Sequence, residues 1–269
     1  MDDLTGDTVT AAWVHGDEVA YSWYGSMLGL IIADMGNQAR LFRGGNIAMP
    51  YSTGGIVFSR NKTVETFLER DVPWLWWVDT DMGFEPDVVE LLMAAADAEE
   101  RPVVGGLCFA MKHAAPDTAN GFVGLPLPTL YQWGEMDGKE GFVPMVEYPR
   151  DSLVQCAGTG SACILIHRSV FERIAEDEGP NWYTPVRHPD LGEVSEDLSF
   201  CLRLARLGIP LWVNTAAKTT HLKHVWTSEA MFDVFKRNAE EGRSFVAEAS
   251  DALKPKGNRA ERRRKAKVK

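Results

Sequence analysis

The 269-residue sequence lacks several features that assign a chain to common classes of protein. It contains no apolar run close to the ~20 residues of a membrane-spanning helix. Its acidic, Trp-containing start has none of the ordered regions of a secretory signal. Neither G-x-G-x-x-G nor G-x-x-x-x-G-K-[ST] occurs, which argues against a Rossmann dinucleotide site and against a P-loop. We therefore expect a cytoplasmic protein without a membrane span.

Cysteine is also scarce. The four cysteines form no C-x-x-C pair, and three of them lie inside apolar segments, so buried reduced thiols are favoured over disulfides or zinc. They are Cys108, Cys156, Cys163 and Cys201. Apolar and charged fractions of 45% and 25% are ordinary for a soluble globular protein, and the length fits one large α/β domain or two small ones.

The net charge of −10 is unevenly distributed. Residues 254–269 contain nine Lys and Arg and one Glu, which gives this segment +8 and leaves −18 for the rest. Such a tail is expected to be disordered or loosely helical, and either to contact an acidic partner, nucleic acid or anionic surface or only to aid solubility. The acidic body argues against a nucleic-acid-binding domain.

The most informative stretch is an apolar run that ends in two aspartates. Residues 72–78 (VPWLWWV) are followed directly by Asp79-Thr80-Asp81. The run is too short for a typical buried helix, so it predicts a central strand buried on both faces. In open α/β sheets the ligand binds beyond the carboxyl ends of the strands, and residues two apart point the same way. Asp79 and Asp81 are therefore predicted to suit Mg²⁺ or Mn²⁺ with a phosphate as co-ligand, the alternative being a turn or helix cap.

Two earlier segments predict contacts with a nucleotide. Residues 11–14 form a short apolar strand that leads into His15-Gly16-Asp17 at the ligand edge and then into a helix over 19–35. Residues 57–68 have the apolar spacing of a helix that packs on the sheet and carries Arg60 in its early turns. There a cation and helix amides would meet phosphate or ribose; the alternative is an arginine on a solvated face.

The second half of the chain contributes a Gly-rich strand and an acidic helix start. Gly158-Thr159-Gly160 precedes the apolar strand 162–166, and its glycines allow a backbone to approach a ligand closely. Ser195-Glu196-Asp197 begins a helix that Gly208 ends, with Ser195 as the N-cap. Acids in a first turn are also favoured by the helix dipole alone.

The remaining pattern completes an alternation of strands and helices. It predicts strands at 101–109 and 209–213, helices at 85–96 and 169–178, strand-like pieces at 40–52, and loops with a small hairpin at 110–148. The aromatic residues of the last segment suit an acceptor platform or pack as a satellite of the core.

The order of these segments resembles a GT-A-fold glycosyltransferase of the broad family 2 kind. The resemblance spans roughly residues 11–225, and it rests on Arg60-Asn61, Asp79-Thr80-Asp81, Gly158-Thr159-Gly160, Ser195-Glu196-Asp197 with Phe200-Cys201, and His221. It implies an α/β fold with a single mixed, mostly parallel sheet flanked by helices. It implies a domain over 1–227, with a nucleotide-binding half (11–110) and an acceptor half (111–227). The residues from Ser228 onward lie outside the resemblance, and there we expect a helical extension (228–253) and the basic tail (254–269).

The same resemblance implies an enzyme that moves a sugar from a nucleotide-diphospho-sugar, such as a UDP- or GDP-sugar, to a hydroxyl of a protein or glycan. Asp79, Asp81 and His221 would hold Mn²⁺ or Mg²⁺, which acts as a Lewis acid on the leaving nucleotide. Asp197, beside Glu196, would deprotonate the acceptor in an inverting reaction. The donor would contact His15-Gly16-Asp17, Arg60-Asn61, Asp79 and Gly158-Thr159-Gly160.

The sequence departs from the family 2 pattern after its first strand, which lacks the usual proline. It also lacks the Gln-x-x-Arg-Trp signature of processive synthases, and His224 competes with His221 as a ligand. Two other functions suit the same fold. One is a nucleotidyltransferase that makes nucleotide-sugars, which normally carries a basic Gly-rich loop where this chain has His-Gly-Asp-Glu. The other is a non-catalytic nucleotide-sugar-binding protein.

Overall fold

The structure is a computed structural model that describes residues 6–114, 123–136, 138–224 and 236. The predicted extension at 228–253, apart from residue 236, and the basic tail at 254–269 lie outside the described residues.

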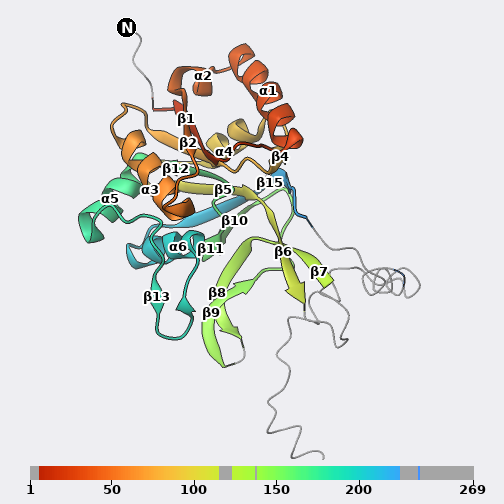
Figure 1. Cartoon of the computed structure of the whole chain (residues 1–269), viewed down its shortest axis with the longest axis vertical. Coiled ribbons are helices and arrows are strands. Elements are labelled where there is room, and N and C mark those ends of the chain that lie inside the picture. Colours follow the sequence, from red (N-terminus) through yellow and green to blue (C-terminus); the bar gives the residue numbers. More distant parts are fainter. Residues whose placement is uncertain (1–5, 115–122, 137, 225–235, 237–269) are drawn as a thin grey trace, which may run out of the picture.

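An eight-stranded sheet forms the centre of the molecule (Figure 1). Its strands are β1 (Val9–His15), β2 (Asn46–Pro50), β3 (Trp74–Val78), β4 (Met82–Phe84), β5 (Val103–Leu107), β10 (Leu153–Cys156), β12 (Cys163–His167) and β15 (Leu211–His221). Their order is β10-β15-β5-β12-β3-β1-β2, and β4 pairs with the end of β15. β1, β2, β3, β5 and β15 run in one direction, while β12, β10 and β4 run in the other. The predicted mixed, mostly parallel sheet is confirmed.

Strand β3 lies inside this sheet and is buried along its whole length. Its alternation places Leu75 and Trp77 in the core on one face, and Trp74 and Trp76 in the core on the other. Since both faces are covered, the run carries only apolar residues. The chain leaves the sheet at Asp79, directly after the buried strand.

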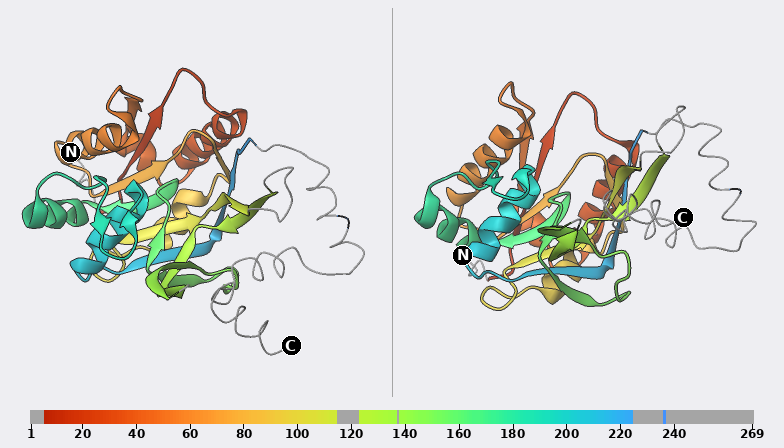
Figure 2. Two further views of the ribbon diagram at one scale, coloured as in Figure 1. Left: turned by 60° about the horizontal axis from the view of Figure 1, so that its bottom comes forward. Right: turned by 90° about the horizontal axis from the view of Figure 1, so that it is seen from below.

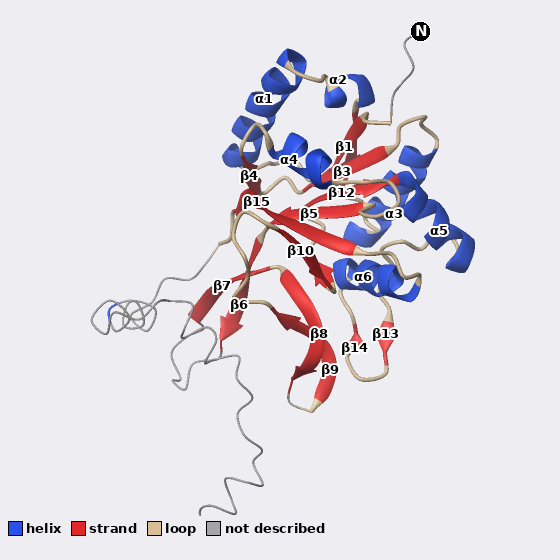
Figure 3. Ribbon diagram, turned by 180° about the vertical axis from the view of Figure 1, so that it is seen from behind, coloured by secondary structure: helices blue, strands red, loops and turns tan. Residues whose placement is uncertain are grey.

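Within the described part of the chain, six helices cover the two faces of the sheet (Figures 2 and 3). They are α1 (Tyr21–Gly36), α2 (Arg40–Gly44), α3 (Gly55–Leu68), α4 (Val88–Ala95), α5 (Arg168–Glu178) and α6 (Glu196–Arg206). Buried side chains of α1, α2 and α4 share one core with Trp76, and those of α3, α5 and α6 share the other with Trp77. This arrangement gives the flanked sheet that the sequence predicts.

Three smaller sheets project from one side of the molecule (Figure 1). They pair β6 (Phe109–Ala114) with β7 (Val123–Pro128), β8 (Leu130–Met136) with β9 (Lys139–Pro144) and β11 (Gly158–Thr159), and β13 (Arg187–His188) with β14 (Gly192–Glu193). The segment 110–148, predicted as loops with one hairpin, therefore contributes to two hairpins.

Two predicted elements are corrected. The stretch 40–52 begins with helix α2 instead of strand pieces, because the Asp34 carboxylate accepts the backbone N–H groups of Leu41 and Phe42, 3.2 and 2.9 Å away. Strand β15 continues from the predicted 209–213 to His221, because its far part also pairs with β4. The four cysteines are free; Cys156 is half-buried and the other three are buried.

Candidate active site

A cleft of about 490 Å³ opens where the carboxyl ends of the parallel strands meet. Its lining comes from the ends of β1, β3 and β15, from α3 and from the first turn of α6, and consists of Val14, His15, Gly16, Tyr51, Ile56, Arg60, Asp79, Thr80, Asp81, Glu196, Asp197, His221 and Lys223. The Asp79–Asp81 segment, Asp197 and His221 are far apart in sequence, and the fold brings them to one cleft.

Arg60 bridges two carboxylates in this cleft. Its side chain is 2% exposed, and one guanidinium nitrogen donates to Asp79 over 3.2 Å while another donates to Asp197. The guanidinium lies over the rings of Trp77 and Tyr183, 5.7 and 5.3 Å from their centroids. Arg60 is therefore not on a solvated face. It lines the cleft with its charge paired to two protein carboxylates, and its contact with phosphate or ribose stays a prediction.

Asp81 belongs to a second cluster. His221 Nε2 lies 3.0 Å from Asp81 Oδ2, and Lys223 Nζ lies 2.8 Å from the same oxygen. The other ring nitrogen of His221, Nδ1, lies 2.7 Å from the Phe109 carbonyl oxygen. Because a carbonyl oxygen only accepts, Nδ1 carries a proton. The contact between Nε2 and Asp81 then requires a second ring proton or a cation shared by the two atoms.

The two aspartates of the D-x-D segment have opposite electrostatic environments. Burial raises the pKa of Asp79 above its ordinary value, the attraction of Arg60 opposes this, and the charges of Asp197 and Asp81 add to the rise. Burial also raises the pKa of Asp81, but the hydrogen bonds from His221 and Lys223 outweigh it and hold this pKa at about 2. Burial lowers the pKa of Arg60, yet attraction to Asp197 and Asp79 more than compensates, so its net pKa is raised. Asp81 is therefore a carboxylate throughout the neutral pH range.

The side-chain atoms Asp81 Oδ2 and His221 Nε2 are suited to hold a divalent cation whose remaining ligands come from a substrate. The carboxylate oxygen suits Mn²⁺ or Mg²⁺, and the imidazole nitrogen favours a transition metal such as Mn²⁺ over Mg²⁺, which prefers oxygen ligands. The Nδ1–H bond to a carbonyl is the usual support of a metal-binding histidine. Among the described residues, no three His, Cys, Asp or Glu side chains form a group able to hold an ion. Asp79, predicted as a third ligand, is turned toward Arg60 instead. Two protein ligands leave positions for phosphate oxygens and water.

Asp197 has one engaged oxygen and one that faces a glycine. Oδ1 accepts from Arg60, whereas Oδ2 lies 3.7 Å from the point that a Cβ at Gly160 would occupy. The backbone at Gly160 therefore leaves space beside Oδ2, and a side chain there would fill it. Glu196 precedes Asp197 in the same first turn and also lines the cleft. Ser195 takes the N-cap position, but its side chain makes no capping hydrogen bond.

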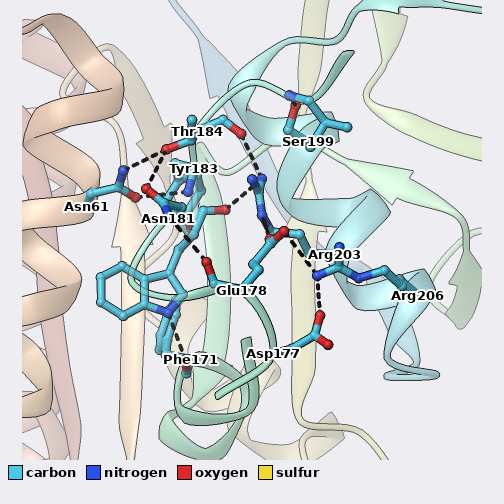
Figure 4. Close-up of polar contacts among 12 residues, drawn as sticks. Asn61, Phe171, Asp177, Glu178, Asn181, Tyr183, Thr184, Ser199, Arg203 and Arg206 are labelled. Atoms are coloured by element: carbon cyan, nitrogen blue, oxygen red, sulfur yellow. Dashed lines mark hydrogen bonds and ion pairs between the residues drawn. The ribbon is translucent and has the colours of Figure 1, made fainter. Parts of the chain in front are cut away.

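A polar network connects helices α3, α5 and α6 through the loop between α5 and α6 (Figure 4). Arg203 of α6, 5% exposed, donates to Glu178 at the end of α5 and to the Thr184 carbonyl, 2.8 Å away. Asn61 of α3 accepts the Tyr183 N–H over 2.9 Å and donates to the Thr184 hydroxyl. Asn61, predicted as a donor contact, thus holds the loop between α5 and α6 and does not line the cleft.

Other predicted contacts also have structural placements. Gly158 lies against Phe142 and Leu198, where a Cβ would approach their side chains to 2.7 and 3.1 Å. Thr159 is buried and donates to a backbone carbonyl over 2.7 Å. Asp17 is exposed and absent from the cleft lining. His224 is exposed as well and does not line the cleft, so of the two competing histidines only His221 lies there.

Two polar residues of the cleft, Lys223 and Tyr51, were not predicted as site residues from the sequence. Lys223 lies two residues after His221, and both side chains contact Asp81. Residues two apart in an extended segment point the same way, so this spacing could have predicted Lys223 from the position of His221. Tyr51 follows the edge strand β2 and is 59% exposed at the cleft. Its position depends on the pairing of β1 with β2, a strand that lies within the strand-like pieces predicted at 40–52 but whose neighbour in the sheet was not predicted.

None of the helices within the described ranges combines the length and apolar character that a membrane crossing requires. No protein-family model and no curated protein matches the sequence.

The central sheet and its flanking helices form a GT-A-like fold. Among solved structures, the crystal structure of GalNAc-T7 with UDP, GalNAc and Mn²⁺ is similar to it, with a TM-score of 0.51 and 10% identity over 87% of this chain. The match covers 48% of the GalNAc-T7 chain, so this chain spans about half the length of that relative. A197 from STIV matches with a TM-score of 0.43 and 14% identity, over 81% of this chain and 86% of its own. At 10% identity, the likeness to GalNAc-T7 shows a GT-A-like fold alone.

Proposed function

We propose that this protein is a metal-dependent glycosyltransferase. It transfers a sugar from a nucleotide-diphospho-sugar, of the UDP or GDP type, to a hydroxyl group of a cytoplasmic protein or glycan. One observation carries the proposal: Asp79, Asp81, Asp197 and His221 converge on a single cleft at the carboxyl edge of the sheet. The UDP, GalNAc and Mn²⁺ bound in the GalNAc-T7 structure are consistent with this chemistry.

The donor end of the cleft is formed by β1, β2 and the D-x-D segment. Asp81 and His221 would hold Mn²⁺ or Mg²⁺, which, when bound, screens the charge of the diphosphate and stabilises the leaving nucleotide. Lys223, 2.8 Å from Asp81, reaches the same region and adds a positive charge. His15, Gly16 and Tyr51, at the ends of β1 and β2, also line the cleft and would receive the nucleoside.

Asp197 acts as the general base. Its Oδ2 accepts the proton of the acceptor hydroxyl, whose oxygen bonds to the anomeric carbon as the bond from that carbon to the diphosphate breaks. Arg60 holds Oδ1 and thereby orients the carboxylate, and Gly160 leaves room for the acceptor beside Oδ2. Attack from the side opposite the leaving group inverts the anomeric centre. A positioned base contributes about 10²–10⁴-fold to the rate.

A donor panel tests the proposal. The protein is incubated with UDP- and GDP-sugars, with and without Mn²⁺, and release of the nucleotide is measured. We expect metal-dependent release that Asp197→Asn lowers about 10²–10⁴-fold without loss of the fold. Asp81→Ala should remove the Mn²⁺-dependent rise in thermal stability that nucleotide produces. Asp17→Asn, an exposed acid outside the cleft lining, is the matched control and should change neither readout.

The two alternatives give other results. Exchange of pyrophosphate into a nucleoside triphosphate would identify a nucleotidyltransferase. Saturable nucleotide-sugar binding without turnover, unchanged by Asp197→Asn, would identify a binding protein. Either result would refute the proposed transfer reaction.

A further inference from the structure

Helix α1 exposes a continuous apolar face. Six large side chains, Tyr21, Tyr24, Leu28, Ile31, Ile32 and Met35, are between 42% and 88% exposed. They recur at intervals of three and four residues, so they lie on one side of the helix. Figures 1 and 3 show α1 at the outer surface, away from the small sheets. The opposite side of the helix is anchored by Trp23, Met27 and Leu30 in the core.

This face differs from an ordinary solvated helix surface. An exposed helix side normally carries charged residues, and a helix that is apolar on all sides is normally covered. The one charged residue of α1 is Asp34, and it is buried, where it caps α2. A single exposed apolar residue needs no explanation, but a contiguous patch of this kind marks an interaction surface.

We propose that the α1 face binds the α1 face of a second copy of this chain, forming a two-fold symmetric dimer. The spacing 21-24-28-31-35 is the alternating three-and-four pattern of helices that pair along a seam. A two-fold interface places the same patch on both sides, so it must complement itself. An uncharged apolar face can pack against a copy of itself. Elsewhere, two copies that each carry a net charge of −10 repel one another.

The size of the face agrees with this partner. A large side chain offers on the order of 150–250 Å², so six residues at these exposures provide roughly 700 Å². A standard interface buries about 800 Å² per partner. Beside the face, an apolar hollow of about 180 Å³ lies between Ile31 of α1 and Phe42 of α2, and it can receive a side chain of the partner helix. Phe42 is 69% exposed and extends the surface.

A membrane surface is the competing occupant, and the charges disfavour it. Helices that lie in a lipid interface carry Lys and Arg on their polar side, and α1 contains neither. The proposed dimer does not depend on the proposed transferase activity, because no residue of the α1 face lines the cleft.

Sedimentation equilibrium of the full chain tests the dimer. We expect a mass twice that of the chain at micromolar concentration, and at least about 100-fold weaker association for Leu28→Glu and Ile32→Glu, which would bury unpaired charges. Phe58→Glu is the matched control: it is 56% exposed on α3, outside the α1 face, and should leave the dimer intact. Circular dichroism and thermal unfolding verify that each variant is folded.

A cross-link provides a second measurement that does not depend on charge. Leu28 lies at the middle of α1. If the two-fold axis passes through the middle of the two paired helices, Leu28 of one copy contacts Leu28 of the other. Leu28→Cys should form a disulfide-linked dimer under mild oxidation, and Phe58→Cys should not. A monomeric wild-type chain at 100 μM, or a dimer that Leu28→Glu and Ile32→Glu leave intact, overturns the proposal. Binding to phosphatidylcholine vesicles that Ile32→Glu abolishes, with a monomeric chain, overturns it in favour of the membrane.

Discussion

Replacement of Arg60 tests the electrostatic design of the cleft most directly. Arg60→Met keeps a long apolar side chain against Trp77 and Tyr183 but removes the charge between Asp79 and Asp197. The two carboxylates then share a cleft without their common counterion. Arg60→Lys retains one positive charge, but a single ammonium does not reproduce the forked geometry by which a guanidinium binds two acceptors.

The expected loss of stability follows from burial. Breaking a buried ion pair by removing one partner costs about 3–5 kcal/mol. Here the side chains of Asp79 and Asp197 are 29% and 27% exposed, so water solvates them in part and lowers the cost. In addition, Arg60 Nε is buried without a hydrogen-bond partner, which destabilises the folded state by about 1–3 kcal/mol. Arg60→Met removes this group, so part of the lost stability is offset. We expect Arg60→Met to lower the free energy of unfolding by about 2–3 kcal/mol, and Arg60→Lys by less.

Urea denaturation of a double-mutant cycle measures this coupling. If the cost arises from two unpaired carboxylates, Asp197→Asn added to Arg60→Met should recover about 1 kcal/mol, within the range of couplings between contacting residues. Arg203→Met, which removes a buried arginine outside the cleft lining, should also destabilise the protein but should be additive with Asp197→Asn. Additive losses for Arg60 and Asp197 would refute the assignment of Arg60 as their shared counterion.

Three further outcomes are expected. Lys223→Met should strengthen Mn²⁺ binding by about 5-fold in calorimetry. The ion pair of the half-exposed Lys223 ammonium with Asp81 contributes about 1 kcal/mol, and in the variant this ammonium no longer competes with the metal. Equal or weaker Mn²⁺ binding would contradict this competition. Burial lowers the pKa of His167, which caps α5, below its ordinary 6.5, so the unfolded chain binds more protons just below that pH. Stability should therefore be full above pH 6.5 and fall as the pH drops toward the folded-state pKa, and His167→Asn, which keeps a capping side chain, should remove that part of the fall. Burial raises the pKa of all four cysteines, to about 12 for Cys156 and about 11 for Cys163, so iodoacetamide at pH 8 should modify them only in denaturant; rapid labelling of the native protein would contradict this.

The sheet and the residues around the cleft were largely predictable because they depend on local patterns. An apolar run buried on both faces identifies β3, and the carboxyl edge of a parallel sheet then places Asp79 and Asp81 at a cleft. The contacts of these residues do not follow from local patterns, because they depend on pairings distant in sequence. His221 was predicted beside Asp81 only through the family resemblance, and it reaches Asp81 because β15 extends to pair with β4. Asn61 instead holds a loop more than a hundred residues away and does not line the cleft.

The balance of charges in the cleft explains why a divalent cation belongs to the proposed function. Four carboxylates line it, those of Asp79, Asp81, Glu196 and Asp197, against the two permanent cations Arg60 and Lys223. Arg60 is already bound to two of the acids and Lys223 to a third, so both cations of this lining are paired with protein carboxylates before a diphosphate enters. A nucleoside diphosphate entering without a cation would meet net negative charge at close range. UDP or GDP should therefore raise the thermal stability only when Mn²⁺ or Mg²⁺ is present, and an equal shift in excess EDTA would show that the cleft binds its ligand by other means.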